Sequence, residues 1–242
     1  MHITIAPDEH AAGRIAATLI GAQLLQKPES VLGLATGETP LPTYAELVRM
    51  HQDGIVSFGR ATTFNLDEYV GLPPGHEQSY HTFMWRHLFS RVNIDPAHTH
   101  LPEGCAADMP AACKAYDAAI EAAGGIDLQL LGIGHNGHIG FNEPGETLDQ
   151  GTHLADLAPT TIQANRRFFA DEAQVPRQAI TMGMGGIMQA RRVLLVACGA
   201  GKADIVAALV TGLITTTVPA SLLRLHRDAH ILVDEDAARK LG

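Results

Sequence analysis

The chain has 242 residues, of which 46% are hydrophobic, and a single domain of this length can bury a large core. Its formal net charge is −9, with 17 basic and 26 acidic residues, which disfavours nucleic acid or an acidic membrane surface as a partner. No apolar run reaches the roughly 18 residues of a membrane span, and the first residues do not resemble a secretion signal. The three cysteines form no CxxC pair, so we expect a cytoplasmic protein with reduced thiols.

Apolar runs alternate with helical patterns along the whole chain. In chain order, the expected elements are a strand at 3–6, a helix at 9–26, a strand at 31–35, a helix at 41–51, a strand at 62–66, helices at 79–89 and 111–123, strands at 126–131, 179–182 and 192–197, a helix at 202–209, and a strand at 230–233 before a short helix. This alternation predicts an α/β fold with a mostly parallel sheet flanked by helices. We expect one domain over residues 1–242.

Polar segments follow four of the predicted strands. They are residues 36–39, 67–69, 135–143 and 199–202. Open parallel sheets bind ligands beyond the carboxyl ends of their strands. We therefore expect these four segments, which are far apart in sequence, to share one edge of the sheet.

The stretch of residues 132–145 carries the strongest functional signal. Its five glycines permit tight turns and close approach to a ligand. Within nine of its residues it offers two histidines, two asparagines and a glutamate, groups that suit an acid–base site. The alternative is a glycine-rich surface turn. The irregular stretch continues to about residue 163, and we expect a lid within about residues 144–175.

Two partial motifs do not predict a nucleotide site. Residues 132–137 match GxGxxG, but Gly140 and Pro144 interrupt the helix that a dinucleotide site needs. Residues 199–202 resemble the end of a phosphate loop, but the first glycine is missing and Ala203 replaces Ser or Thr. We expect no nucleotide cofactor.

A metal site is the other interpretation of this stretch. His135 and His138 lie three residues apart, with Glu143 nearby. This is not the HExxH spacing of zinc hydrolases. Because the same groups serve in proton transfer without a metal, we expect no metal.

Distinctive motifs stand at residues 34–40, 64–69, 79–80, 132–144 and 167–169, and at Lys202, and they span nearly the entire chain. In combination and in order they resemble the motifs of the glucosamine-6-phosphate deaminase family. Related sugar-phosphate lactonases share a similar histidine loop but lack its Phe-Asn-Glu-Pro ending, which is present here at residues 141–144.

The resemblance implies conversion of glucosamine 6-phosphate and water to fructose 6-phosphate and ammonia, a hydrolytic deamination with aldose–ketose isomerisation. It also implies a modified Rossmann-like fold and no cofactor. By the family's roles, Asp67 is the base that moves a proton from C2 to C1. His138 opens the sugar ring, assisted by Asn136 and Glu143. The expected phosphate anchors are Thr36, Gly37, Glu38, Thr39, Arg167 and Lys202.

Two positions depart from the family's common pattern. Asn136 stands where many members have Asp, and an amide can only hold a geometry through hydrogen bonds. Glu38 stands where Gly or Ser is frequent, and a carboxylate repels a phosphate. Either its side chain points away and its backbone N–H binds, or the phosphate loop is assigned wrongly in detail.

Each assignment has a plainer alternative. Asp67 could cap a helix, Glu68 could be a solvated neighbour outside the catalytic set, Arg167 could join a surface ion pair, and Lys202 could simply begin a helix.

The function also has alternatives. They are a galactosamine-6-phosphate deaminase and a non-catalytic sugar-phosphate sensor, which should have lost Asp67 or His138. The chain ends soon after its last strand, so we expect a monomer, with a small homo-oligomer as the alternative.

Overall fold

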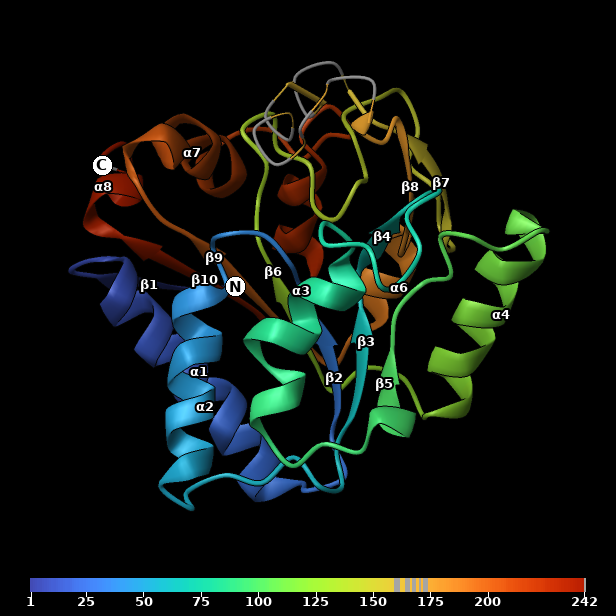
Figure 1. Ribbon diagram of the computed structural model, residues 1–242. Coiled ribbons are helices and arrows are strands. Elements are labelled where there is room, and N and C mark those ends of the chain that lie inside the picture. Colours follow the sequence, from blue (N-terminus) through green and yellow to red (C-terminus); the bar gives the residue numbers. More distant parts are fainter. Residues whose placement is uncertain (159–161, 164–165, 167–168, 170, 172–173, 242) are drawn as a thin grey trace.

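A parallel sheet forms the centre of the fold in the computed structural model, which describes residues 1–158, 162–163, 166, 169, 171 and 174–241 (Figure 1). Its seven strands pair in parallel throughout. The predicted α/β class with a mostly parallel sheet is thus confirmed. The strand order is β1 (His2–Ala6), β10 (Ala229–Asp234), β9 (Arg192–Ala197), β6 (Leu128–Leu131), β2 (Val31–Leu34), β3 (Thr62–Asn65) and β5 (Thr99–His100).

The central strands are buried on both faces, which is why they read as continuous apolar runs rather than alternating patterns. All four residues of β2 and of β6 are buried. Gln129 is the polar exception on β6, and its side chain lies over Gly33 of β2. A Cβ atom added to Gly33 would lie 1.9 Å from Gln129 Oε1, so only glycine fits there.

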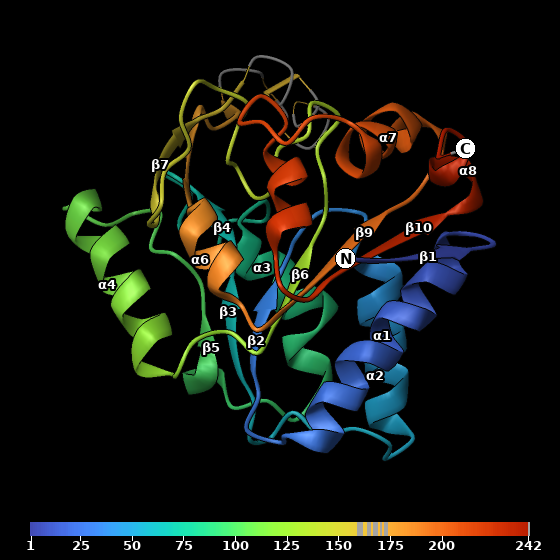
Figure 2. The ribbon, with the colours of Figure 1, turned by 180° about the vertical axis from the view of Figure 1, so that it is seen from behind.

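Helices cover both faces of the sheet. Helix α1 (Glu9–Gln26) packs on α2 (Leu41–Gln52), and α2 lies with α3 (Tyr80–His87) on the face turned toward the viewer in Figure 1. The other face carries α6 (Met184–Gln189) and the 3₁₀ segment η6 (Pro219–Leu225), as Figure 2 shows from behind.

The further helices are α4 (Met109–Ala122), α7 (Ala203–Thr211) and α8 (Glu235–Ala238), and short 3₁₀ turns are η1 (Phe89–Arg91), η2 (Pro96–His98) and η5 (Ala200–Lys202). No helix among the described residues is both long and apolar enough to cross a bilayer.

A second, antiparallel sheet was not predicted. It has the order β4 (Asp67–Tyr69), β8 (Gln178–Thr181) and β7 (His153–Asp156). The sequence predicts the strand at 179–182, but in the main sheet, and it predicts loops at 67–69 and 153–156. Strands of three or four residues with Asp, Glu or His give no alternation that a sequence pattern can detect.

The strand order explains why distant segments meet. Strands β9, β6, β2 and β3 are consecutive neighbours in the sheet, and they run in parallel. Their carboxyl ends therefore lie along one edge. These are the four strands that the polar segments 199–202, 135–143, 36–39 and 67–69 follow, so the expected convergence has a topological basis.

Asp127 connects the opposite ends of these strands. This buried carboxylate accepts hydrogen bonds from Val31 N (2.8 Å), Lys27 Nζ (2.7 Å) and Arg191 Nη1 (3.1 Å), and so joins the starts of β2 and β9 to the end of α1.

Since Asp127→Ala leaves the buried Val31 N–H without its partner, we expect a loss of roughly 2–3 kcal/mol in the free energy of unfolding, measured with urea. Asp53→Ala, which removes an exposed partner of Arg49, is the control and should change it little. Equal effects of both variants would contradict this role.

Candidate active site

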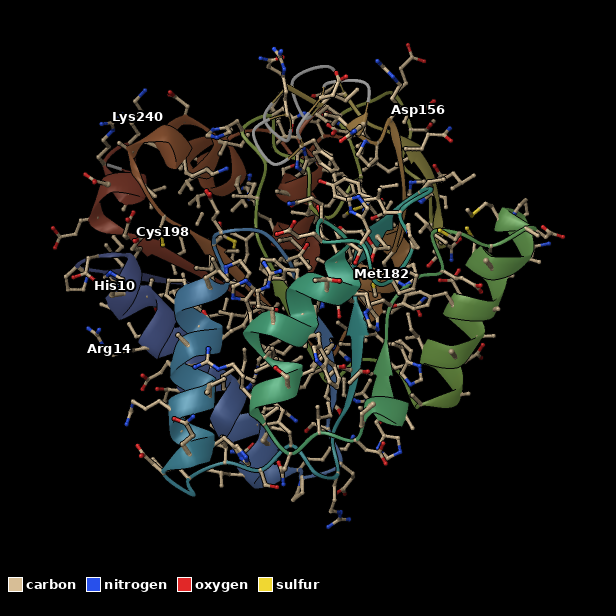
Figure 3. All side chains as sticks on the ribbon, in the orientation of Figure 1. His10, Arg14, Asp156, Met182, Cys198 and Lys240 are labelled. Carbon is tan, nitrogen blue, oxygen red and sulfur yellow. The ribbon has the colours of Figure 1, made fainter. Side chains whose placement is uncertain are left out.

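A cavity of about 460 Å³ opens at the carboxyl edge of the sheet. In Figure 3, two labelled residues mark where strands end: Cys198 directly follows β9, and Met182 directly follows β8. Residues from all four polar segments line the cavity. Its lining residues are Ala35, Thr36, Gly37, Glu38, Thr39, Leu66, Asp67, Tyr80, Gly132, Ile133, Gly134, His135, Asn136, His138, Gly140, Phe141 and Lys202.

Asp67 is a buried carboxylate in the cavity wall. It belongs to β4, where it pairs with Thr181 of β8, so the helix-cap alternative is wrong. Burial raises the pKa of Asp67 to about 8, and the negative charge of Glu68 adds to this effect. A Cβ atom added to Gly140 would lie 3.6 Å from Asp67 Oδ2, so the glycine-rich stretch passes close to the carboxylate. A carboxyl group with a pKa near neutral pH suits proton transfer in both directions.

His138, Asn136 and Glu143 form a connected group on the glycine-rich stretch. Nδ1 of His138 lies 3.3 Å from Oε2 of Glu143, close enough for an ion pair when the ring is protonated, although it is not aligned for a hydrogen bond. Asn136 Nδ2 donates to the same oxygen at 2.7 Å, and Asn136 Oδ1 accepts from His138 N at 3.2 Å. Asn136 therefore fixes the geometry, as its amide chemistry requires. Glu143 does not line the cavity but sits beside the imidazole.

Gly134 and Gly137 are positions of this stretch where a side chain would not fit. A Cβ atom on Gly134 would lie 2.3 Å from the His138 ring, so the imidazole packs directly against the Gly134 backbone. Gly137 has φ of 92°, a left-handed conformation that side chains disfavour. These constraints hold the His138 ring where it reaches the cavity.

The proposed phosphate anchors line the same cavity. Lys202, at the end of η5, donates from Nζ to the carbonyl of Ile133 at 2.7 Å, and burial lowers its pKa. Gly37 has φ of 92°, and Glu38 is exposed to solvent. The loop leads into α2, which has no side-chain cap. The first helical positions offer an anion little, because Leu41 N–H donates to the Glu38 carbonyl at 3.1 Å and Pro42 has no N–H. Anion-binding N–H groups on this side of the cavity must therefore come from residues 36–39 themselves. Arg167 lies outside the described residues, as does part of the predicted lid.

Two polar side chains that line the cavity, Tyr80 and His135, are not among the site residues predicted from the sequence. Tyr80 is the first residue of α3, and His135 places Nδ1 3.2 Å from the carbonyl of Gly201, next to Lys202. Both residues belong to predicted motifs, at 79–80 and 132–144, but no spacing rule separates them from their neighbours. Among the described residues, no group of three or more His, Cys, Asp or Glu side chains is arranged to hold a metal ion.

Glu68 is not the solvated neighbour that one interpretation allowed. It is buried, and its carboxylate accepts hydrogen bonds from the backbone N–H groups of Tyr69 (2.8 Å), Tyr80 and His81 (both 2.9 Å). Its burial next to Asp67 could not be read from the sequence, because β4 itself was not predicted.

Comparison with known proteins places the chain in a family. The sequence profile of glucosamine-6-phosphate isomerases and 6-phosphogluconolactonases matches residues 8–232. The chain belongs to this family. Relatives described as glucosamine-6-phosphate deaminase include one from Clostridium perfringens, 51% identical over 241 residues and the full length of both chains. Another, from Shewanella loihica, is 52% identical over all of this chain and 90% of its own.

Solved structures agree with this placement. A structure described as a monomeric glucosamine-6-phosphate deaminase superposes with a TM-score of 0.96 at 42% identity, over 99% of this chain and 100% of its own. A 6-phosphogluconolactonase from Trypanosoma brucei superposes with a TM-score of 0.80 at 19% identity, over 100% of this chain and 98% of its own. The second likeness shows the shared fold alone.

Asp67→Asn tests the burial of this carboxylate through stability. Because the folded-state pKa of Asp67 lies above its ordinary value of 3.8, the native state favours the protonated form. Wild-type stability should therefore fall as pH rises from about 4 to about 8, at about 1.4 kcal/mol per pKa unit. Asn resembles the protonated form, so the variant should gain stability over wild type across this range. Urea unfolding at pH 5 and pH 8 measures the difference, and a pH-independent gap would contradict the raised pKa.

Proposed function

We propose that this chain converts glucosamine 6-phosphate and water to fructose 6-phosphate and ammonia. The observation that carries the proposal is the placement of Asp67 and His138 in one cavity, with Lys202 and the 36–39 loop in the same wall. Relatives about 50% identical over the full length that are described as glucosamine-6-phosphate deaminase support the choice of substrate. The release of ammonia by water explains our expectation of a hydrolase, although the central chemistry is isomerisation with deamination.

His138 opens the sugar ring in this proposal. Opening requires removal of the proton from the anomeric hydroxyl and addition of a proton to the ring oxygen. An imidazole can do both near neutral pH. Glu143, 3.3 Å from Nδ1, stabilises the charged imidazolium, and Asn136 holds that carboxylate in place.

Asp67 then transfers a proton between adjacent carbons. In the open-chain aldehyde, the carboxylate removes the C2 proton, the C2–H electron pair forms the C1–C2 double bond, and the carbonyl oxygen takes a proton from solvent to give the enolamine. The same carboxyl returns its proton to C1 while the amino group releases one proton to solvent, which leaves an imine at C2. Water adds to the imine and ammonia departs, giving the ketose. A raised pKa lets one group take and return the proton.

The phosphate binds through local groups, because the net charge of −9 gives no general attraction. We assign Lys202 and the backbone N–H groups of the loop that leads into α2 to this role. With Glu38 in the loop, the backbone rather than the side chain is the anion-binding part. Arg167 is proposed as a second cation, and a lid within about 144–175 as a cover for the cavity.

A monomer remains our proposal for the oligomeric state. The solved relative described as monomeric, which this chain matches over its full length, supports it.

Ammonia release from glucosamine 6-phosphate tests the function directly. We expect turnover by wild type with no loss on addition of a chelator, and a much lower rate with the galacto-epimer.

Asp67→Asn should abolish turnover while still binding substrate, because an amide cannot carry the proton. His138→Gln should lose far more rate on the closed ring than on an open-chain analogue. A higher rate on the epimer would instead identify a galactosamine-6-phosphate deaminase.

Lys202→Ala tests the phosphate site. Because the substitution removes a charged partner, KM for glucosamine 6-phosphate should rise by about 10-fold or more, while kcat/KM for free glucosamine changes little. Steady-state kinetics on both sugars measures this. An equal change for both sugars would remove Lys202 from the phosphate site.

A further inference from the structure

The buried carboxylate of Glu68 accepts three hydrogen bonds from the backbone. Its Oε1 accepts from the N–H groups of Tyr69 (2.8 Å) and Tyr80 (2.9 Å), and its Oε2 accepts from the N–H group of His81 (2.9 Å). Tyr80 and His81 are the first two residues of α3. One buried carboxylate thus joins the strand that carries Asp67 to the helix that carries Tyr80.

The site leaves Glu68 no room to move away. A Cβ atom added to Gly104 would lie 3.3 Å from Glu68 Cγ and 2.2 Å from the carbonyl oxygen of Tyr69, so the backbone at Gly104 covers this side closely. On β8, Ile180 is the partner of Glu68. The carboxylate is therefore held between packed backbone segments, with α3 as its polar contact.

Helix capping alone does not explain this arrangement. Helix α3 already has an N-cap, because Ser79 Oγ accepts the N–H of Thr82 at 3.1 Å. A buried carboxylate costs more free energy than a neutral cap, and this one lies next to another buried acid. The three N–H donors favour its charged form against the burial that raises its pKa.

We propose that Glu68 is a positioning residue for the deaminase reaction, one that holds Tyr80 in the cavity wall and sets the electrostatic environment of Asp67. This inference rests on the proposed function. Tyr80 lines the cavity beside Asp67, and its ring is stacked with that of Phe141, another lining residue, with centroids 6.4 Å apart. Movement of the α3 N-terminus would therefore change the wall that faces the substrate.

The charge of Glu68 acts on a crowded group of ionisable side chains. It adds to the burial that raises the pKa of Asp67. A substitution of Glu68 removes this charge and leaves Asp67, the proposed base, unaltered. The titratable groups around the two acids are Tyr69 on β4, Tyr80 and His81 on α3, Tyr44 on α2 and Tyr116 on α4, with Glu38, His135, His138 and Lys202 lining the same cavity.

Glu68→Gln separates positioning from simple structure. Loss of the charge should lower the pKa of Asp67, so the acid limb of the kcat/KM profile should move to lower pH by on the order of one unit. The NH2 group of the introduced glutamine also faces the backbone N–H of His81 or of Tyr80, where two donors cannot form a hydrogen bond. The start of α3 should therefore shift, and kcat should fall at least several-fold. KM should change less, because Lys202 and the 36–39 loop are untouched.

Two further variants serve as controls. Ser79→Ala removes the cap of the same helix without altering charge, and should lower the melting temperature with an unmoved pH profile. Glu68→Asp keeps the charge but is one methylene too short to reach all three N–H groups. It should lower kcat and leave the acid limb in place, and it remains informative if the Gln variant does not fold.

An acid limb of Glu68→Gln that coincides with wild type would overturn the electrostatic role, and wild-type kcat in Glu68→Asp would overturn the positioning of Tyr80. Wild-type protein that releases no ammonia from glucosamine 6-phosphate would instead reject the proposed function.

Discussion

The burial of Asp67 is the constraint on which the rest of the site depends. A carboxylate in water is fully ionised at neutral pH and is a weak base for a carbon-bound proton. Here β4 places it inside the wall of the cavity, against the glycine-rich stretch and next to Glu68, and its pKa rises to about 8. Burial of two adjacent acids opposes stability, so the fold must hold them by other means. The three N–H groups on Glu68 and the pairing of β4 with β8 provide that support.

The parallel sheet brings the other groups to the same place. Because β9, β6, β2 and β3 are neighbours, four loops that are distant in sequence open into one cavity with separate tasks. The β6 loop carries the imidazole group, the β2 and β9 loops carry the groups that we propose to bind the phosphate, and β3 leads into Asp67. Rigid strands anchor each loop, so side-chain geometry is maintained where α/β folds commonly bind ligands.

Much of this could be predicted from the sequence, for identifiable reasons. Strands β2, β6 and β9 are apolar runs, and α1 is preceded by a capping Asp8, so their positions follow from local pattern. The convergence of Asp67, Asn136, His138 and Lys202 follows from the parallel topology. The small sheet and the burial of Glu68 could not be predicted, because β4 is Asp-Glu-Tyr, a polar triplet that is buried only through tertiary contacts with β8 and α3. The role of Tyr80 in the wall depends on the same contacts.

The protonation of Asp67 is the most direct test of this account. A ¹³C NMR titration of protein labelled at aspartate carboxyl groups, with Asp67→Asn used to assign the signal, would measure it in the ligand-free protein. The account predicts that the Asp67 carboxyl titrates near pH 8. A titration near the ordinary aspartate value of 3.8 would contradict it.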